Sequence, residues 1–266
     1  LCGLAARFRT MTTATATPPA PAGIGFDRAG LDALLAAQAA PGWAADRRRA
    51  ALAALESLAL PDRRSENWMR TDLRTFKPAA WRLAAAPPPA ATVPAGLLAE
   101  AILSGDVAAD VLAEPPAVPP AAATLAGRFA SLDGHVVRDE LDPALAARGV
   151  AFGSADRILA EHADALRPHW LSVIDAKSDW FAALHAAFHR ASAVLYVPAG
   201  VRIAAPLHVL AAIAAGGVDT SHVLVVLGEG AEATLLTETA GGGPAGSAGG
   251  FHCGGTEIVV GRGAFL

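Results

Sequence analysis

The chain has 266 residues, of which 53% are hydrophobic, so it is long enough to bury a sizeable core in one or two domains. It carries 21 Lys and Arg residues against 25 Asp and Glu residues, and this net charge of −4 argues against a primary nucleic-acid binder. The two cysteines, Cys2 and Cys253, exclude a disulfide-dense scaffold and any site built from four thiolates. Such sparse cysteine usage is typical of a reducing, cytoplasmic compartment.

The first residues show no pattern of a packed element, and we expect residues 1–22 to form a disordered leader. The first ten are too short and too rich in arginine for a secretory signal. The chain also has no run of about 18 apolar residues, the length that crosses a membrane. Even the apolar stretch 194–213 is interrupted, by Pro198 and Gly200 among others. We therefore expect a protein without a membrane anchor.

Two amphipathic helices are predicted next. Asp27 can cap the first, with Phe26 placed to pack on it as a hydrophobic staple. The second carries apolar residues at helical spacing over 51–58 and ends before Pro61, so the pair should run antiparallel. The arginine triplet 47–49 could bind an anion, but we favour a solvated helix face.

From residue 78 to residue 120 the chain is rich in alanine and proline, which favours irregular structure with at most a short helix over 97–103. Order is expected to return near Leu125. There, Asp133 and Gly134 lie between two β-rich runs and suit the positive φ angles of a tight hairpin turn.

Three further helices are predicted before residue 190. Asp142 and Pro143 should open a short one that Gly149 closes, and Ser154 should cap another that reaches about residue 166. Ser178 or Asp179 should cap the third. Its apolar face is predicted to comprise Phe181, Leu184, His185 and Phe188.

The pattern changes to short β-rich runs punctuated by glycine from Val194 to Leu266. A run of β-branched residues meets Gly-x-Gly-Ala twice, and the glycines Gly230 and Gly263 stand 33 positions apart. Glycine supplies the positive φ that a tight turn needs, so successive segments could stack as coils. This predicts a parallel β-helix or a related layered β structure.

The segment Gly228–Ala233 reads G-x-G-x-x-A after a strand-like run, as in dinucleotide-binding folds. It reaches a glycine triplet at 241–243 after too few residues for the crossover helix that such folds require. We therefore interpret it as a turn. Neither lysine follows a glycine, so no phosphate-binding P-loop is present, and no G-x-S-x-G motif indicates a serine hydrolase.

His185 and His189 are four residues apart on a predicted helix, a spacing that lets two imidazoles share zinc. A zincin would need glutamate where this chain has Ala186. We favour packing for His185 and a surface position for His189. No carboxylates form a recognisable acid/base pair, and we expect Glu229, Glu232, Glu238 and Glu257 to be outward-facing strand residues.

His252 and Cys253 are the one Cys/His neighbour pair in the chain. A thiolate there could accept sulfur or ligate a metal, and the surrounding glycines would leave it accessible. A lone Cys-His pair has no specificity as a motif, so we favour an incidental loop thiol. A role for Cys253 in handling sulfur stays open.

The segment Leu60–Arg74, with arginines followed by Glu66-Asn67-Trp68 and Thr71-Asp72-Leu73, resembles the N-terminal signature of the SufB/SufD family, and most closely of its SufD subunit. Further stretches resemble the same family in the same order. They are Leu132-Asp133-Gly134, Arg148-Gly149-Val150, Phe181–Phe188, Val194–Val201 with Pro206-Leu207-His208, Gly228–Ala231 and Thr256–Gly261.

The resemblance implies an α+β fold in which an N-terminal helical domain precedes a right-handed parallel β-helix. We assign residues 23–190 to a mostly helical domain that includes the segment 78–120, and residues 191–266 to the first coils of the β-helix. Later coils and a C-terminal helical segment of the family have no counterpart up to Leu266, so we expect a C-terminally truncated chain that is prone to aggregation when expressed alone.

The function implied is that of a non-catalytic scaffold subunit in iron–sulfur cluster assembly, working with a SufB-type subunit and a SufC-type ATPase. SufB-like subunits carry a cysteine two residues after a glutamate. If Glu238 is that glutamate, Ala240 replaces the cysteine, which disfavours a SufB assignment. We predict no catalytic, cofactor or metal residue in this segment and a cluster assembled by the complex. The alternatives are a β-helix enzyme such as an acyltransferase, or a metal-dependent hydrolase using His185 and His189.

Overall fold

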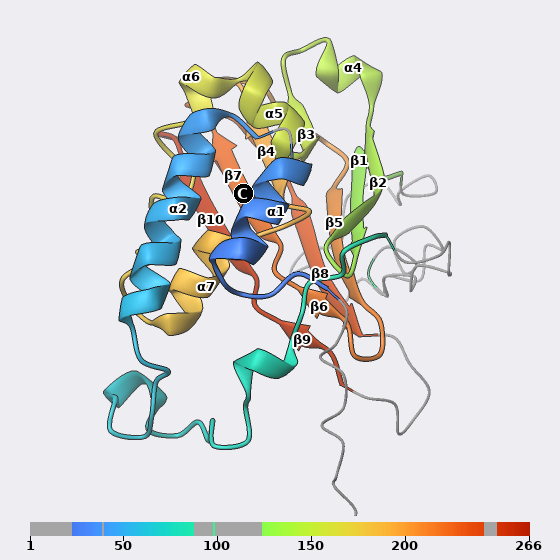
Figure 1. The fold of residues 1–266 in the computed structure, drawn as a ribbon. Helices are drawn as coiled ribbons and strands as arrows, with labels where there is room; N and C mark the ends of the chain where they lie inside the picture. The colour runs from blue at the N-terminus through green and yellow to red at the C-terminus, as the bar shows by residue number, and fades with distance from the viewer. Residues whose placement is uncertain (1–22, 39, 88–97, 99–123, 242–248) are drawn as a thin grey trace, which may run out of the picture.

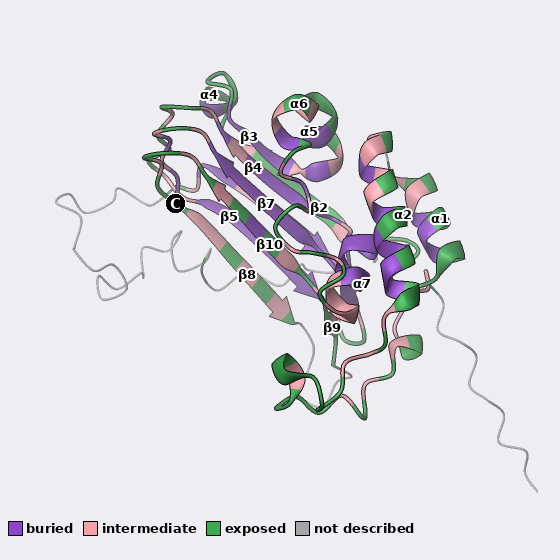
Figure 2. Ribbon diagram, turned by 90° about the vertical axis from the view of Figure 1, so that its left-hand side faces the viewer, coloured by how far each residue is buried: buried purple, intermediate pink, exposed green. Residues whose placement is uncertain are grey.

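A computed structural model of the chain describes residues 23–38, 40–87, 98, 124–241 and 249–266. Two four-stranded sheets lie face to face, and a layer of helices covers the outer face of one of them (Figures 1 and 2). Within the described residues, no helix has the length and apolar character needed to cross a membrane. The predicted leader over 1–22 and nearly all of the predicted helix over 97–103 lie outside the described residues.

The helices are α1 (Arg28–Ala37), α2 (Gly42–Ser57), α4 (Pro143–Ala146), α5 (Ala155–Glu161), α6 (Ala163–Leu166) and α7 (Trp180–Phe188), with 3-10 turns η1 (Glu66–Trp68) and η2 (Pro78–Ala80). The strands are β1 (Gly127–Leu132), β2 (His135–Leu141), β3 (Ala151–Ser154), β4 (Ala193–Val197), β5 (Leu207–Ile213), β6 (Val218–Asp219), β7 (His222–Leu227), β8 (Leu235–Gly241), β9 (Phe251–His252) and β10 (Gly255–Val260).

One sheet has the order β2-β1-β5-β8 and the other has the order β10-β7-β4-β3, while β6 and β9 form a separate pair. Pairing is antiparallel only at β1 with β2 and at β3 with β4. Every pairing among β4 to β10 is parallel, as is that of β1 with β5. Strands β1 to β3 come from the part of the chain assigned by sequence to the helical domain, so both parts contribute strands to each sheet.

Parallel neighbours recur at a regular interval along the chain. Val223 of β7 pairs with Ala193 of β4 on one side and with Thr256 of β10 on the other. These paired residues stand 30 and 33 positions apart, and β5 pairs with β8 at an interval of 28 positions, with Leu207 opposite Leu235. The predicted repeat of glycine turns therefore corresponds to a repeat in strand register.

The core between the sheets explains the apolar runs of the sequence. Alternate residues of β4, β5 and β7 point inward and pack together, among them Leu195, Val209 and Val225, with Phe129 and Phe152 from β1 and β3. All six residues of β7 are buried because helices cover its other face (Figure 2). Strands buried on both faces lose the two-residue alternation of polarity, which is why the sequence reads as continuous apolar runs.

The helical layer has two parts. Helices α5 and α6 and the buried Trp170 cover Val194, Leu224 and Val226 on the outer face of the sheet. Helices α1, α2 and α7 form the second part, in which Leu31, Leu52 and Leu184 are among the buried side chains. Asp27 caps α1 by accepting from the Gly30 amide, and Asp179 caps α7 by accepting from the amides of Phe181 and Ala182, as predicted.

Other local predictions hold in part. The hairpin at Asp133-Gly134 is confirmed, with φ angles of 48° and 74°. The short helix after Asp142 is confirmed as α4, and Gly149 follows it with φ of 81°. The single helix predicted from Ser154 to residue 166 is wrong, because the backbone at His162 leaves helical geometry and divides it into α5 and α6.

The prediction that the arginine triplet 47–49 forms a solvated helix face is wrong for Arg48, which is only 1% exposed. Its Nε donates to the carbonyl of Ala187 at 2.8 Å, and its guanidinium also bonds Gln38. Burial lowers the pKa of Arg48 to about 10. The residue therefore joins α2 to α7, while Arg49 on the exposed face pairs with Asp46.

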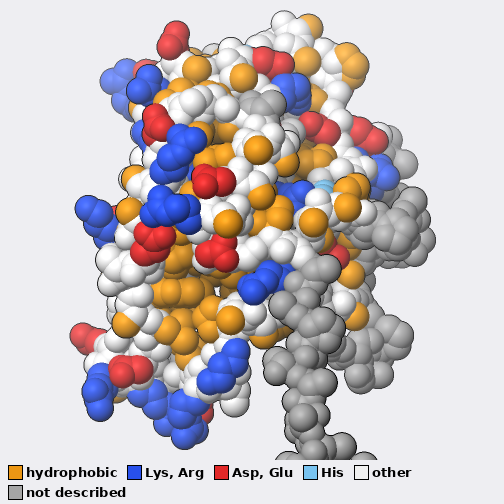
Figure 3. All heavy atoms as spheres, viewed as in Figure 1, with side chains coloured by type: hydrophobic (Ala, Val, Ile, Leu, Met, Phe, Trp, Pro, Cys, Tyr) orange, Lys and Arg blue, Asp and Glu red, His pale blue; other side chains and the backbone are white. Residues whose placement is uncertain are grey.

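An extended arm, residues 59–82, runs along one end of the helical layer and is attached by aromatic side chains (Figure 1). Trp68 stacks on Phe181 with ring centroids 5.0 Å apart, and Phe76 and Trp81 both contact Phe251. Figure 3 shows apolar side chains between α7 and this arm, with basic groups along the lower rim. The family-like segment around Trp68 is thus a docking element of the fold.

Candidate functional site

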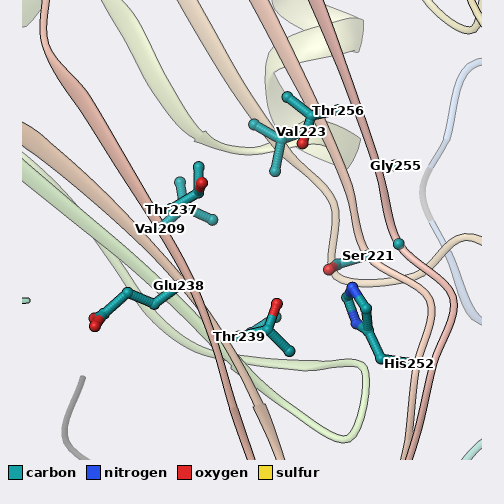
Figure 4. A pocket seen from close by; sticks show the side chains of 11 residues that line it. Val209, Ser221, Val223, Thr237, Glu238, Thr239, His252, Gly255 and Thr256 are labelled. Carbon is teal, nitrogen blue, oxygen red and sulfur yellow. The ribbon is translucent and has the colours of Figure 1, made fainter. Parts of the chain in front are cut away.

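A polar cavity of about 180 Å³ lies between the two sheets at the edge formed by β8, β9 and β10. Figure 4 shows Thr237 and Thr239 of β8 on one side and Ser221, His252 and Thr256 on the other. Glu238, between the two threonines, points away from the others. The lining combines hydroxyl groups with apolar side chains, among them Val209 and Val223, which also belong to the core between the sheets.

His252 is the one ring in this cavity wall, and a buried carboxylate fixes its orientation. Its Nδ1 lies 2.9 Å from Oδ2 of Asp219, a residue with no solvent exposure. The same oxygen accepts from the amide and hydroxyl of Ser221, at 3.2 and 2.9 Å. Because Oδ2 acts as an acceptor in all three contacts, Nδ1 carries the ring proton and Nε2 keeps a free electron pair.

The adjacent residue Cys253 faces the opposite side of the backbone. Its side chain packs in the helical cluster, and Sγ lies 3.6 Å from the carbonyl oxygen of Phe181. Burial and the nearby carboxylates of Asp179 and Asp219 raise the pKa of Cys253 to about 12. The residue is therefore a partly buried, protonated thiol, and the imidazole of His252, on the other side of the backbone, cannot activate it. The accessible loop thiol suggested by the glycine-rich sequence is not found.

A second polar network lies between helix α7 and the sheet strands β7 and β10. His185 of α7 contacts the carbonyl of Cys253 through Nδ1, and its Nε2 lies 3.0 Å from Nδ1 of His222. On the far side of this ring, Nε2 of His222 lies 3.5 Å from Oε2 of Glu257. Burial and the neighbouring His222 lower the pKa of His185 to about 4, so this imidazole is neutral near pH 7.

Glu257 was expected among outward-facing strand carboxylates, but it is only 1% exposed. Its two oxygens accept from the amides of Ser172, Val173 and Ile174, at 2.8 to 3.2 Å. Burial alone would raise the pKa of Glu257, but the His222 imidazole and these amides outweigh it and lower the pKa to about 2. The carboxylate thus fastens β10 to the loop that follows Trp170.

The prediction that His189 lies at the surface is wrong. It is 5% exposed, its Nδ1 lies 3.2 Å from Oγ of Ser192, and its ring meets Trp170 edge to face. Burial lowers the pKa of His189 well below its usual value. The predicted packing of His185 is confirmed. Among the residues that the structure describes, no group of three or more His, Cys, Asp or Glu side chains is arranged so that it could hold a metal ion.

The glycine motif at Gly228–Ala233 forms a turn between β7 and β8, with Gly230 at φ of 65°. A Cβ added at Gly228 would lie 2.5 Å from the Ala199 amide nitrogen, so the motif allows close stacking of successive turns. No crossover helix follows it. The dinucleotide interpretation is therefore excluded for this segment, as the short spacing indicated.

Glu238 lies on the outer face of β8 with Ala240, because residues two apart on a strand share a face. Its Oε2 is 2.7 Å from Nε2 of the buried His208, and its Oε1 accepts from the amide of Leu98. The contact between Glu238 and His208 joins β5 to β8, and the Glu238 carboxylate points away from the cavity.

Asp219 and His222 are the residues that sequence reasoning missed. Asp219 stands in a short polar stretch without a motif, and His222 opens an apolar run as one polar residue among valines. The 33-residue repeat of the glycine turns was the one sequence feature that could have pointed to Asp219. Asp219 lies 33 residues before His252, and the strands that carry them pair in register.

Comparison with known proteins finds partial similarity to iron–sulfur cluster assembly proteins. No protein-family model matches the chain. The chain is 37% identical to the iron–sulfur cluster assembly protein SufB of Bacillus subtilis over 83 residues, 31% of this chain and 18% of that protein. It is 28% identical to a SufBD-family iron–sulfur cluster assembly protein of Staphylococcus epidermidis over 143 residues, 53% of this chain and 30% of that protein.

A SufBD-family protein of Staphylococcus haemolyticus is 31% identical over 83 residues, again 31% of this chain and 18% of that protein. The matched segments thus span less than a third of the length of these relatives. All three relatives carry names of the one family that the sequence motifs resemble. The predicted resemblance to the SufB/SufD family of iron–sulfur cluster assembly proteins is confirmed by these similarities.

Proposed function

We propose that this chain is part of a SufD-type scaffold subunit that serves iron–sulfur cluster assembly in the cytoplasm. In this proposal it is not an enzyme by itself and acts with a SufB-type subunit and a SufC-type ATPase. The observation that carries the proposal is the likeness to SufB and SufBD-family assembly proteins, which reaches over half of this chain.

We also propose that β4 to β10 are the first coils of a right-handed parallel β-helix. Three rows of parallel pairs support this: β4 with β7 and β10, β5 with β8, and β6 with β9. The isolated bridges from Arg202 to Glu232 and from Glu232 to Phe265 add a fourth row, at the turns. Paired residues stand 30 positions apart between β4 and β7, 33 between β7 and β10, 28 between β5 and β8, and 33 between β6 and β9. Such similar intervals are expected when each coil passes through the same strands in turn.

The SufD-type assignment rests on position 240. Glu238 and Ala240 share the outer face of β8, and the cysteine that SufB-like subunits carry two residues after a glutamate is alanine here. Cys253 does not replace it, since its thiol is partly buried and protonated. Sulfur acceptance would therefore belong to the SufB-type partner, and ATP hydrolysis to the SufC-type partner. We propose that this segment binds no cofactor alone and that the cluster forms on the complex.

Neither alternative enzyme is favoured by the geometry. A hexapeptide-repeat acyltransferase would need a short turn every six positions, whereas the contact between the successive strands β5 and β8 spans 30 residues. A zinc hydrolase would need His185 and His189 to be open to a substrate, but both rings are buried.

The test uses the full-length protein that contains this chain, co-expressed with the SufB-type and SufC-type proteins of the same genome. We expect the three to co-purify and to hold a reconstituted cluster, seen by its visible absorbance. A matched Cys253→Ala protein should assemble equally well, because that thiol is structural. Failure to co-purify would contradict the proposal, and loss of the cluster in Cys253→Ala would contradict the assignment of sulfur chemistry to the partner.

A further inference from the structure

His185 of α7 and His222 of β7 form a buried pair of imidazoles, the histidine pair. The two residues are 3% and 0% exposed, and Nε2 of His185 lies 3.0 Å from Nδ1 of His222. The backbone of β10 is adapted to this approach. A Cβ added at Gly255 would lie 2.6 Å from Nε2 of His185, so glycine at this position leaves room for the contact between the two rings.

The groups at the two ends of the histidine pair fix the number of ring protons. At one end, Nδ1 of His185 lies 3.0 Å from the carbonyl oxygen of Cys253, which is an acceptor, so Nδ1 carries a proton. The contact between the two ring nitrogens needs a second proton. At the other end, Nε2 of His222 lies 3.5 Å from Oε2 of Glu257, and among the described residues no hydrogen-bond donor reaches it. A proton on this Nε2 gives an ion pair, whereas a lone pair would face the carboxylate. The three contacts thus require three protons, one more than two neutral imidazoles carry.

The anions around the histidine pair favour the extra proton. Burial would raise the pKa of Glu257, but the His222 imidazole and the amides of the adjoining loop outweigh it and lower the pKa to about 2, so the carboxylate stays ionised. The buried Asp219 carboxylate also acts on the pair, since it favours the charged form of His185. Burial and the neighbouring His222 nevertheless lower the pKa of His185 to about 4. The extra proton therefore resides on His222.

The other ionisable groups around the pair do not replace this charge. His189, whose ring centroid lies 6.3 Å from that of His222, is neutral because burial lowers its pKa well below the usual value. The Cys253 thiol is protonated, because burial raises its pKa to about 12. The nearby cations of α2, Arg47 and Arg48, each donate to a backbone carbonyl. The carboxylates therefore remain available as counter-ions for the histidine pair.

We propose that the histidine pair holds one extra proton in the folded protein at neutral pH, and that this buried charge acts through Glu257 to hold the loop at residues 172–174 on β10. The two oxygens of Glu257 accept from the three amides of this loop. When the proton leaves at alkaline pH, a lone pair of His222 faces the carboxylate, and the loop is released. This inference does not depend on the proposed function.

The sign of the pH dependence follows from the unfolded chain, in which a histidine has a pKa of about 6.5. Folding near pH 8 therefore takes up a proton at the histidine pair. The stability that this proton contributes is complete below about pH 6.5 and is lost as the pH rises through the higher pKa of the folded pair.

The first experiment uses the full-length protein labelled with ¹⁵N at histidine, with ring signals assigned by correlation to the backbone amides. At pH 7.5 both ring nitrogens of His222 should be protonated, whereas His185 should carry its proton on Nδ1. Glu257→Gln removes the counter-ion, so its His222 should be neutral at this pH. Glu229→Gln, at an exposed glutamate, is the matched control and should give the wild-type ring signals. A neutral His222 in the wild-type protein at pH 7.5 would overturn the proposal.

The second experiment measures amide hydrogen exchange in the same wild-type protein at pH 7.5 and pH 9.5. The amide of Gly30, which donates to the Asp27 carboxylate at the start of α1, reports the rise that base catalysis alone produces. The amides of residues 172–174 should exceed that rise by about tenfold, because local opening adds to it. Loop amides that follow Gly30 would overturn the proposal. Both wild-type measurements decide it even where Glu257→Gln does not fold.

Discussion

The carboxylate of Glu257 lies 3.5 Å from the Nε2 atom of His222, and neither side chain is exposed to solvent. The two residues come from neighbouring strands, since β7 and β10 are paired in parallel. Through its bonds to the amides of Ser172, Val173 and Ile174, the same carboxylate also fixes a loop outside the sheet. The Glu257 side chain of β10 thus contacts a histidine of β7 and a loop outside the sheet.

Replacing Glu257 by glutamine should destabilise the protein by about 3 kcal/mol, because a buried carboxylate that accepts from three amides is removed and one oxygen becomes a donor facing amide donors. Urea unfolding at pH 7 measures this change. Glu229→Gln is the matched control, since Glu229 is exposed and pairs with Arg262 only at the surface. Its effect should stay below about 1 kcal/mol. Equal effects of the two variants would contradict the role of Glu257 in fastening β10 to the loop that follows Trp170.

Stability should fall as the solution is acidified below about pH 6.5. The pKa of His185 drops from 6.5 in the unfolded chain to about 4 in the folded one, so the unfolded state binds more protons between these values. Glu257 extends the loss of stability to lower pH. Its pKa is about 2 in the folded chain and 4.5 ordinarily, so its contribution to stability disappears as the pH falls between these two values. Together these groups should remove several kcal/mol between pH 6.5 and pH 3. Unfolding free energies measured across this range test it, and a flat profile would contradict it.

Arg48→Ala should cost about 3 kcal/mol or more, whereas Arg49→Ala should cost less than about 0.5 kcal/mol. Arg48 is buried and donates to the Ala187 carbonyl, so its loss leaves a cavity and an unpaired acceptor between α2 and α7. Arg49 has an exposed partner, Asp46. Thermal unfolding followed by circular dichroism separates the two, and similar melting temperatures would show that the triplet is a solvated face after all.

Cys253 should react slowly with a thiol reagent in the folded protein at pH 8 and quickly in urea. Burial holds its pKa near 12, so the reactive thiolate is scarce until the chain unfolds. Absorbance on reaction with 5,5′-dithiobis(2-nitrobenzoate) gives the rate, and a Cys2→Ser background isolates this thiol. A native rate close to the unfolded rate would mean that the thiol is accessible.

Trp68→Ala should release the arm at residues 59–82 without unfolding the sheets. Within the described residues, aromatic contacts such as that of Trp68 with Phe181 fasten this arm, while its hydrogen bonds and ion pairs are local. We expect faster proteolysis after Arg70 and Arg74, with the cleavage sites read by mass spectrometry. Met69→Ala removes an exposed neighbour, 56% accessible, and should leave the digestion pattern unchanged.

The sequence by itself determined the local elements of this protein and its resemblance to the SufB/SufD family. The caps at Asp27 and Asp179, the hairpin at Asp133-Gly134 and the repeated glycine turns depend on neighbours in the chain, so their residue types are sufficient signals. Tertiary structure decided what the polar residues do. Arg48, His189 and Glu257 are buried because segments far away in sequence fold over them.

The same reason explains the candidate site. His252 and Cys253 are adjacent in the chain, but an extended backbone sends successive side chains to opposite faces, one to the cavity and one to the helices. The pairing of β6 with β9 brings Asp219 to His252 across 33 residues. Helical and strand periods can be read from nearby residues, whereas a buried polar contact depends on which distant strands become neighbours, and only the folded chain establishes that.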